Sequence, residues 1–179
     1  PGQTLAGLIG VIAQQFDLVP NLSVLQNVLA GRLGEWSLAK SLLSLVWPRD
    51  HQRALDALER VGVAHLAYQR AARVSGGEQQ RIAIARLLVQ HPRIVLADEP
   101  VASLDLPRAH EVLRLLTAVT EEQGETLIAS LHDVDLARRY FARIVGLRSG
   151  RVQFDKPTSS IQDRELAKLY EIDEPTREA

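Results

Sequence analysis

The chain of 179 residues contains no cysteine and no methionine. The lack of cysteine excludes disulfides, thiolate metal ligands and a cysteine nucleophile. Because methionine is missing even from position 1, a natural translation start is absent, and we interpret the sequence as a piece of a longer or processed protein. No apolar run approaches the roughly 18 residues that span a bilayer, and no signal peptide opens the chain, so a membrane role would be exercised through a partner.

The sequence also lacks a large excess of positive or negative charge. The formal net charge is −1 at pH 7, which gives no reason to expect nucleic acid or another polyanion as a partner. Apolar residues make up 46% of the chain and charged residues 24%, which is typical of an ordinary globular protein and not of a disordered one. A chain of this length can bury a sizeable core as one domain.

Apolar strands alternate with helices in the second half of the chain. Strands are predicted at residues 8–13, 94–97 and 126–130, a hairpin over 144–154, and helices over 24–32, 51–61, 75–91, 107–122, 134–141 and 160–170. The short apolar runs are typical of buried strands, and the alternation predicts an α/β core with a mostly parallel sheet. Residues 24–74 contain no convincing strand, so we expect an all-helical subdomain beside that sheet.

Ser75 and Glu78 have the spacing of a capping box, which predicts a helix that begins at Ser75 and that Pro92 stops. Gly76 and Gly77 would let a phosphate approach the free N–H groups at the start of this helix, where the helix dipole also favours an anion. The alternative for these residues alone is a capped helix with loop glycines and no ligand.

Two carboxylates, Asp98 and Glu99, directly follow the predicted strand 94–97. The carboxyl ends of parallel strands deliver side chains into a ligand crevice, where one carboxylate can hold the waters of Mg²⁺ and the other can accept a proton from a water that attacks a phosphate. His132 follows the next strand and is expected at the same edge. The alternatives are a charged turn and a surface histidine, the class to which we assign the other four histidines: His51, His65, His91 and His110.

Five motifs in this order resemble those of the nucleotide-binding domain of ATP-binding cassette (ABC) transporters. Residues 12–16 resemble the Q-loop, 74–81 (Val-Ser-Gly-Gly-Glu-Gln-Gln-Arg) the signature motif, 94–100 the Walker B strand, 101–105 the D-loop and 130–133 the switch-histidine loop. The resemblance covers nearly the whole chain and implies a P-loop NTPase-like α/β fold, with a mostly parallel sheet and an inserted all-helical subdomain. It divides the chain into the core strand and Q-loop (1–22), the helical subdomain (23–91), the α/β core (92–158) and a C-terminal helix and tail (159–179).

The resemblance also implies roles for single residues, with ATP and Mg²⁺ as the bound groups. Glu99 would be the catalytic base, His132 would contact the γ-phosphate and Asp98 would lie on the magnesium side. Gln14, with Gln15 as the alternative, would sense the magnesium and couple to membrane subunits. The remaining expected nucleotide contacts are Ser75, Gly76, Gly77, Glu78 and Asp105. The signature residues among them would close over the ATP held by the other subunit of a head-to-tail homodimer.

The chain departs from the family pattern in three places. The phosphate-binding motif G-x-x-x-x-G-K-[ST] is nowhere in the sequence and would lie before Pro1. We therefore expect this polypeptide alone to bind ATP poorly and to hydrolyse none. Glu78 stands where glutamine is common and Val74 where leucine is common. The capping box is expected to turn the Glu78 carboxylate back onto its own helix, away from a bound phosphate.

Residues 28–34 and 54–62 look like the phosphonate-importer branch of the family. This implies an ATPase at the cytoplasmic face of the membrane, bound to integral-membrane permease subunits and served indirectly by an extracytoplasmic solute-binding protein. ATP hydrolysis would drive uptake of phosphonate or a related phosphorus-containing anion. The alternatives are an importer ATPase for another small solute, or a truncated, inactive nucleotide-binding module. A non-transport ABC protein is disfavoured, because the sequence has no coiled-coil insertion, second cassette or basic patch.

Overall fold

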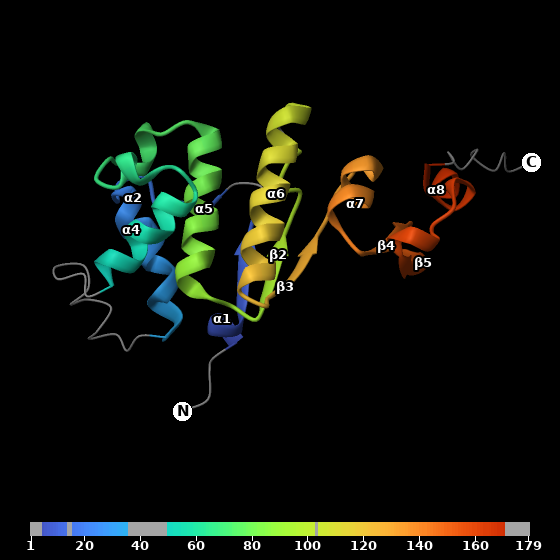
Figure 1. Ribbon diagram of the computed structural model, residues 1–179, viewed down its shortest axis with the longest axis horizontal. Coiled ribbons are helices and arrows are strands. Elements are labelled where there is room, and N and C mark those ends of the chain that lie inside the picture. Colours follow the sequence, from blue (N-terminus) through green and yellow to red (C-terminus); the bar gives the residue numbers. More distant parts are fainter. Residues whose placement is uncertain (1–4, 14–15, 36–49, 103, 171–179) are drawn as a thin grey trace, which may run out of the picture. The chain divides into compact units, whose positions relative to one another are not determined.

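The computed structural model describes residues 5–13, 16–35, 50–102 and 104–170 (Figure 1). The chain forms two compact units, residues 1–132 and 133–179. In order, the first unit contains α1 (Leu5–Leu8), β1 (Ile9–Ile12), α2 (Val24–Leu29), η1 (Ala30–Glu35), α4 (His51–Arg60), η2 (Ala64–Leu66), η3 (Ala71–Arg73), α5 (Gly76–Gln90), β2 (Ile94–Ala97), α6 (Leu106–Glu122) and β3 (Thr126–Ala129), where η denotes a 3₁₀ helix.

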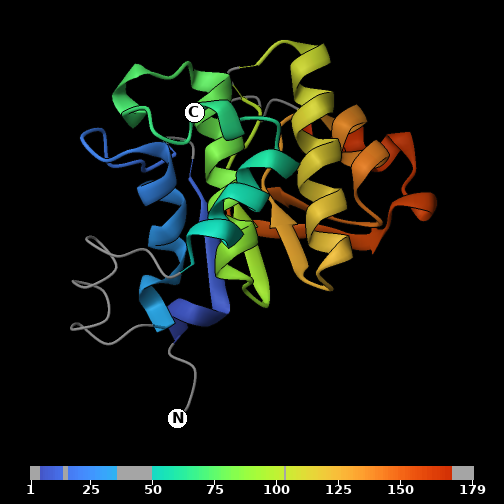
Figure 2. The same cartoon turned by 60° about the vertical axis from the view of Figure 1, so that its left-hand side comes forward.

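The sheet of the first unit is parallel throughout, in the order β1-β2-β3, which confirms the predicted α/β core. Helices α5 and α6 lie beside the strands in both views (Figures 1 and 2). They cover the sheet face that carries Ile12, Val95 and Ala97, all of which are buried. This face of the sheet is therefore covered by a packed layer of helices.

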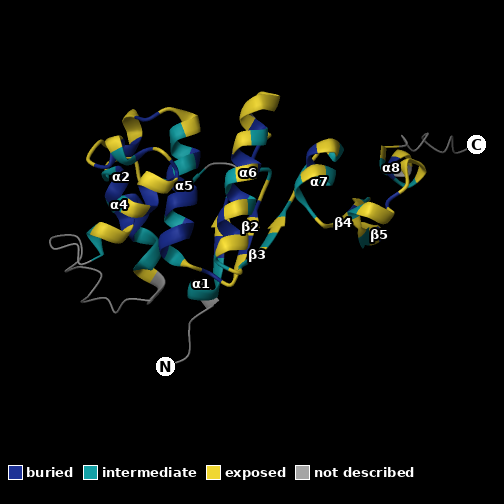
Figure 3. Cartoon of the chain, viewed as in Figure 1, coloured by how far each residue is buried: buried dark blue, intermediate teal, exposed yellow. Residues whose placement is uncertain are grey.

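Strands β2 and β3 also contain exposed residues, drawn yellow in Figure 3, and on the opposite face of the sheet most of the exposed residues are apolar. Val11, Leu96 and Ile128 lie side by side in register and are 50%, 37% and 55% exposed. The prediction that these strands are buried is therefore right for one face and wrong for the other. The physical reason is that α5 and α6 pack on the buried face, whereas no described helix of the first unit covers the exposed row.

The helices α2, α4 and α5 form the predicted all-helical region, with a core that includes Val28, Leu58 and Ile82. No strand occurs among the described residues between 24 and 74. The helix predicted over 24–32 is shorter, because the α-helical hydrogen bonding ends at Leu29 and the chain tightens into the 3₁₀ helix η1. The helix predicted over 51–61 is α4, and Gly62 follows its end with φ 76°, a conformation that is common after a helix.

The other predicted boundaries need small corrections. The strand predicted over 8–13 is shorter, since Leu8 ends α1 and β1 spans Ile9–Ile12. The closing helix begins at Asp163 and not at Ser160, because residues Thr158–Ser160 form the 3₁₀ helix η4.

The second unit contains α7 (Val134–Tyr140), β4 (Arg143–Arg148), β5 (Arg151–Pro157), η4 and α8 (Asp163–Tyr170). The predicted hairpin is confirmed: β4 and β5 are antiparallel and are joined by Ser149 and Gly150, which have φ 50° and 71°. Two consecutive positive φ values are the geometry of a tight hairpin turn. In the part of the chain that the structure describes, no helix is long and apolar enough to cross a lipid bilayer.

Candidate functional site

The two carboxylates and His132 meet at the carboxyl edge of the parallel sheet, as predicted. Strand β2 ends one residue before Asp98, whose N–H donates to the Ile12 carbonyl at 2.9 Å. The N–H of Ser130 donates to the Ala97 carbonyl at 3.0 Å, which continues the β2–β3 pairing by one residue. These backbone bonds fix the residues that follow both strands at one edge.

Side-chain contacts then join these residues into one network. His132 Nε2 lies 2.6 Å from Glu99 Oε1. The Ser130 hydroxyl donates to Asp98 Oδ1 at 2.8 Å and accepts a hydrogen bond from the Glu99 N–H at 2.8 Å. Ser130 was not among the predicted site residues. The signal for it was available in the sequence, because a hydroxyl residue ends the apolar strand two positions before His132.

Glu99 has an unusual backbone for a residue with a side chain. Its φ is 46°, in the left-handed region, which costs a non-glycine residue roughly 1–3 kcal/mol. The side chain is 31% exposed and that of His132 is 82% exposed, so both can be reached from solvent. The strained turn therefore leaves the Glu99 carboxylate partly open to solvent beside an exposed imidazole.

The start of α5 has the predicted capping box. The Ser75 hydroxyl accepts from the Glu78 N–H at 3.4 Å, and Glu78 Oε2 accepts from the Ser75 N–H at 2.7 Å and from the Ser75 hydroxyl at 2.8 Å. These bonds from Ser75 lower the pKa of the Glu78 carboxyl below its usual value. The expectation that this carboxylate turns back onto its own helix is confirmed.

Gly76 and Gly77 have no packing reason to be glycine. A Cβ atom at either position would meet no described heavy atom within 4 Å, and neither residue has a positive φ. Both lie exposed in the first turn of α5, where glycine weakens a helix. The packing and backbone of the described residues would therefore accept a side chain at either position.

Asp105 acts as the N-cap of α6, since its Oδ1 accepts from the Arg108 N–H at 3.0 Å. Its expected role as a nucleotide contact therefore stays a prediction. Gln14 and the alternative Gln15 lie outside the described residues, and so does Ser103 of the expected D-loop.

A family model described as "ABC transporter" matches residues 2–102. The chain belongs to the ABC transporter family. Phosphonates import ATP-binding protein PhnC 1 of Nostoc sp. is 47% identical over 167 residues, which are 93% of this chain and 63% of that protein. The PhnC 2 protein of Pseudomonas syringae pv. syringae is 48% identical over 165 residues, 92% of this chain and 60% of that protein. The chain thus spans less than two thirds of these curated relatives.

Solved structures place the chain in the same family. A dimeric ATP-binding cassette, in a post-hydrolysis state bound to ADP and Pi, matches with a TM-score of 0.68 and 32% sequence identity. The match covers 86% of this chain and 64% of that one. The resemblance and the fold class expected from the motifs are confirmed.

The site fits the Mg²⁺ that the ABC transporter family implies. Among the residues that the structure describes, no group of three or more histidine, cysteine or acidic side chains could enclose a metal ion. Mg²⁺ does not need such a cage, because it is usually bound through one or two carboxylates together with substrate phosphates and waters. Asp98, whose carboxylate accepts a hydrogen bond from the Ser130 hydroxyl, could supply such a carboxylate.

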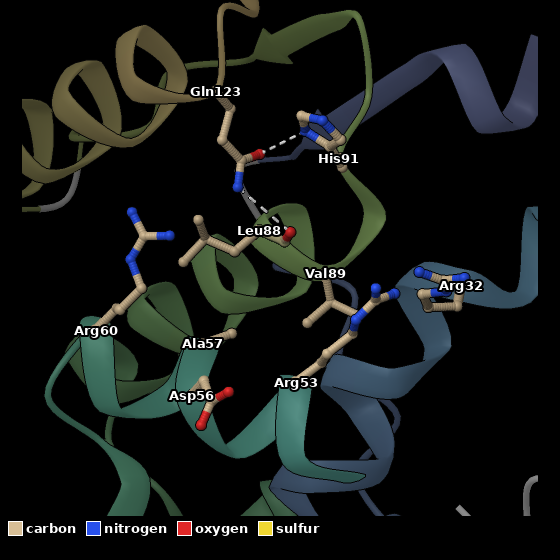
Figure 4. A pocket seen from close by; sticks show the side chains of 9 residues that line it. All are labelled: Arg32, Arg53, Asp56, Ala57, Arg60, Leu88, Val89, His91 and Gln123. Carbon is tan, nitrogen blue, oxygen red and sulfur yellow. Dashed lines mark hydrogen bonds between the residues drawn. The ribbon is translucent and has the colours of Figure 1, made fainter. Parts of the chain in front are cut away.

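A separate pocket of about 330 Å³ lies between α4, the end of α5 and the end of α6 (Figure 4). Its lining residues are Arg32, Arg53, Asp56, Ala57, Arg60, Leu88, Val89, His91 and Gln123, and none of them is a predicted site residue. Arg32 lies near Asp50, Arg60 near Glu122 and His91 near Glu125. Carboxylates therefore already lie beside three of the basic side chains that line this pocket.

Proposed function

We propose that the protein containing this chain is the ATP-hydrolysing subunit of an ABC importer and that phosphonate, or a related phosphorus-containing anion, is its solute. The observation that carries the hydrolytic part is the contact between His132 and the Glu99 carboxylate, next to Asp98, at the carboxyl edge of the sheet. This contact supports the proposal, because attack of water on a phosphate requires a proton acceptor close to groups that can bind the phosphate and its cation.

Each side chain has a distinct part in the proposed reaction. The Glu99 carboxylate accepts a proton from the attacking water, whose oxygen then forms the new bond to the γ-phosphorus while the bond to the ADP oxygen breaks. His132 orients Glu99 and reaches the γ-phosphate, and Ser130 holds Asp98 and Glu99 in fixed relation. Asp98 would hold Mg²⁺, which would neutralise part of the charge on the phosphates.

The signature residues are proposed to complete the site of a second subunit. Gly76 and Gly77 leave the N-terminus of α5 open, and the free N–H groups and dipole of a helix start favour a phosphate. The related cassette bound to ADP and Pi is dimeric. We therefore assign Ser75, Gly76 and Gly77 to the γ-phosphate of the ATP held by the partner in a head-to-tail homodimer.

Transport partners follow from the same proposal. The relatives in Nostoc and Pseudomonas are named as phosphonate import ATP-binding proteins. We infer that the protein binds integral-membrane permease subunits at the cytoplasmic face of the membrane, and that an extracytoplasmic solute-binding protein delivers the anion. Uptake of a labelled alkylphosphonate by cells that carry the neighbouring permease genes tests the solute. Uptake of only an unrelated solute would favour the alternative, an importer ATPase for another small solute.

The hydrolytic assignment is tested with Glu99→Gln in the full-length protein. Because the amide cannot accept the proton, release of inorganic phosphate from ATP should fall by about 10²-fold or more. The matched control is Glu122→Gln, which neutralises an exposed glutamate of α6 that pairs with Arg60. Activity that survives Glu99→Gln would contradict the role of Glu99. An equal loss of activity in Glu122→Gln would show that the effect is not specific to Glu99.

A further inference from the structure

The turn that carries Glu99 is strained, and the structure shows what holds it. A non-glycine residue at φ 46° persists only where its surroundings determine the conformation. The Glu99 N–H is bound by the Ser130 hydroxyl, and the Ala102 N–H donates to the Glu99 carbonyl at 3.3 Å. The next carbonyl, that of Pro100, accepts a hydrogen bond from the side chain of Gln80.

Gln80 lies in α5, five residues after Ser75, and is 1% exposed. Its Nε2 donates to Pro100, but its Oε1 is buried and has no hydrogen-bond partner among the described residues. A buried acceptor without a partner opposes folding, so an apolar side chain of similar size would suit this position better for stability alone. The polar side chain therefore needs a reason other than packing.

We propose that Gln80 is a positioning residue, which holds the Pro100 carbonyl and so keeps Glu99 in the conformation that meets His132. The proposal rests on the proposed function, because it takes Glu99 as the base. It also connects two sites through one helix. Gln80 lies only five residues after Ser75, at the helix start that would bind the partner's ATP, and it contacts the turn that carries the base of the chain's own site. Without the Gln80 bond, the turn can relax toward a negative φ and carry the carboxylate away from the imidazole.

Gln90 offers a matched control at the other end of the same helix. Its Nε2 donates to the Ile9 carbonyl at 2.8 Å, so it makes the same type of bond from α5 to a backbone oxygen of the core. This bond is at the amino end of β1 and does not touch the Glu99 turn. Replacing each glutamine by leucine removes one such bond and leaves the other.

The first test compares Gln80→Leu and Gln90→Leu in the full-length protein. Because misplacing a reacting group by about 1 Å can cost about 10²-fold, kcat of Gln80→Leu should fall by roughly 10-fold to 100-fold. KM for ATP should change by less than about two-fold, since no nucleotide contact is altered, and Gln90→Leu should stay within about two-fold of the native protein in both constants. An unchanged kcat in Gln80→Leu, or the same loss in Gln90→Leu, overturns the proposal.

The second test uses Gln80→Glu and covers the case in which the leucine variant fails to fold. Burial raises the pKa of a carboxyl, and the protonated form has an O–H that can donate to the Pro100 carbonyl, whereas the ionised form cannot. The ratio of kcat for Gln80→Glu to native kcat should therefore fall as the pH rises through that pKa. Division by the native value removes the pH dependence that the two proteins share. A ratio that does not change with pH contradicts the proposal.

Failure of this inference can be told apart from failure of the proposed function. If Glu99→Gln is inactive while Gln80→Leu retains native kcat, Glu99 is the base and Gln80 does not position it. If Glu99→Gln retains activity, the hydrolytic assignment itself is wrong.

Discussion

At the scale of single residues, Glu78 has two opposed effects at the start of α5. Its carboxylate completes the capping box with Ser75, and at the same time it places a negative charge next to the proposed binding point of the partner's γ-phosphate. The Ser75 hydroxyl already donates to this carboxylate, so a phosphate must compete for that donor. The side chain that stabilises the helix start therefore weakens the proposed closure of the dimer.

Replacing Glu78 by glutamine should separate these effects. The amide oxygen can still accept from the Ser75 N–H, while the charge is removed, so we expect ATP-dependent dimerisation of the full-length protein to strengthen by about 0.3–1 kcal/mol per site. Sedimentation or light scattering measures the dimer in a Glu99→Gln background, which is expected to keep ATP intact if Glu99 is the base. Glu165→Gln is the charge-matched control in the second unit. Weaker dimerisation of Glu78→Gln would contradict the proposed repulsion.

Glu125 makes stability depend on pH in a defined direction. Its side chain is 2% exposed, and Oε2 has no hydrogen-bond partner among the described residues. Burial raises the pKa of this carboxyl, and the nearby His91 opposes the rise in part. The folded state therefore binds the proton more tightly than the unfolded chain. This contribution to stability is complete below the unfolded pKa and is lost as the pH rises through the folded pKa.

It follows that Glu125→Gln should increase the free energy of unfolding near neutral pH, because it removes the cost of a buried charge. The gain should be about 1 kcal/mol or more at pH 8 and should shrink as the pH falls to about 4, where the native carboxyl is protonated. Urea unfolding of both proteins at several pH values measures the difference. A gain that is constant across this range would show that ionisation of Glu125 is not its cause.

At the scale of secondary-structure elements, Gly31 sets how closely η1 packs against α5. A Cβ atom at Gly31 would lie 2.6 Å from the Arg86 carbonyl oxygen and 3.2 Å from Arg86 Cγ. The backbone oxygen cannot move without disturbing α5, so Gly31→Ala must push the two elements apart. Such overpacking typically costs about 1–3 kcal/mol.

We therefore expect Gly31→Ala to lower the denaturation midpoint of the protein. Gly124→Asn is a useful comparison, because Gly124 has φ 68° and an open surrounding, and asparagine tolerates that backbone conformation. The loss should be clearly smaller in the Gly124 variant. A Gly31→Ala protein as stable as the native one would mean that η1 can withdraw from α5 at no cost.

The elements that local signals specify were predicted well from the sequence. The capping box at Ser75 and Glu78 and the hairpin predicted over 144–154 depend on residues that are close in the sequence, so the pattern alone contains their cause. The meeting of Glu99 with His132 was also predictable, because parallel strands end at a common edge.

What the sequence could not show depends on contacts between distant residues. The bond from Gln80 to Pro100 and the close packing of Gly31 on Arg86 require the relative placement of separate elements. The left-handed φ of Glu99 has no signal in the residue type, because glutamate rarely adopts it. The exposure of one sheet face depends on which segments cover it, and hydrophobicity alone does not contain that information.

At the scale of the whole molecule, each unit has apolar strand residues that face solvent. In the first unit these are Val11, Leu96 and Ile128, and in the second Val145, Leu147 and Val152. Contiguous exposed apolar patches and unpaired strands favour association. The charge of −1 gives little electrostatic repulsion to oppose it.

We therefore expect the 179-residue polypeptide to self-associate and to bind a hydrophobic dye when produced alone. Val11→Thr with Ile128→Thr should reduce both effects, because threonine suits a strand and lessens the apolar surface of the row. Val19→Thr is the matched control, since Val19 is similarly exposed, at 49%, but lies outside the sheet. If residues before Pro1 supply the phosphate-binding motif and cover this face, a longer form should bind less dye and gain ATP binding together. A longer form that gains ATP binding while the row stays open to the dye would show that another partner covers the sheet.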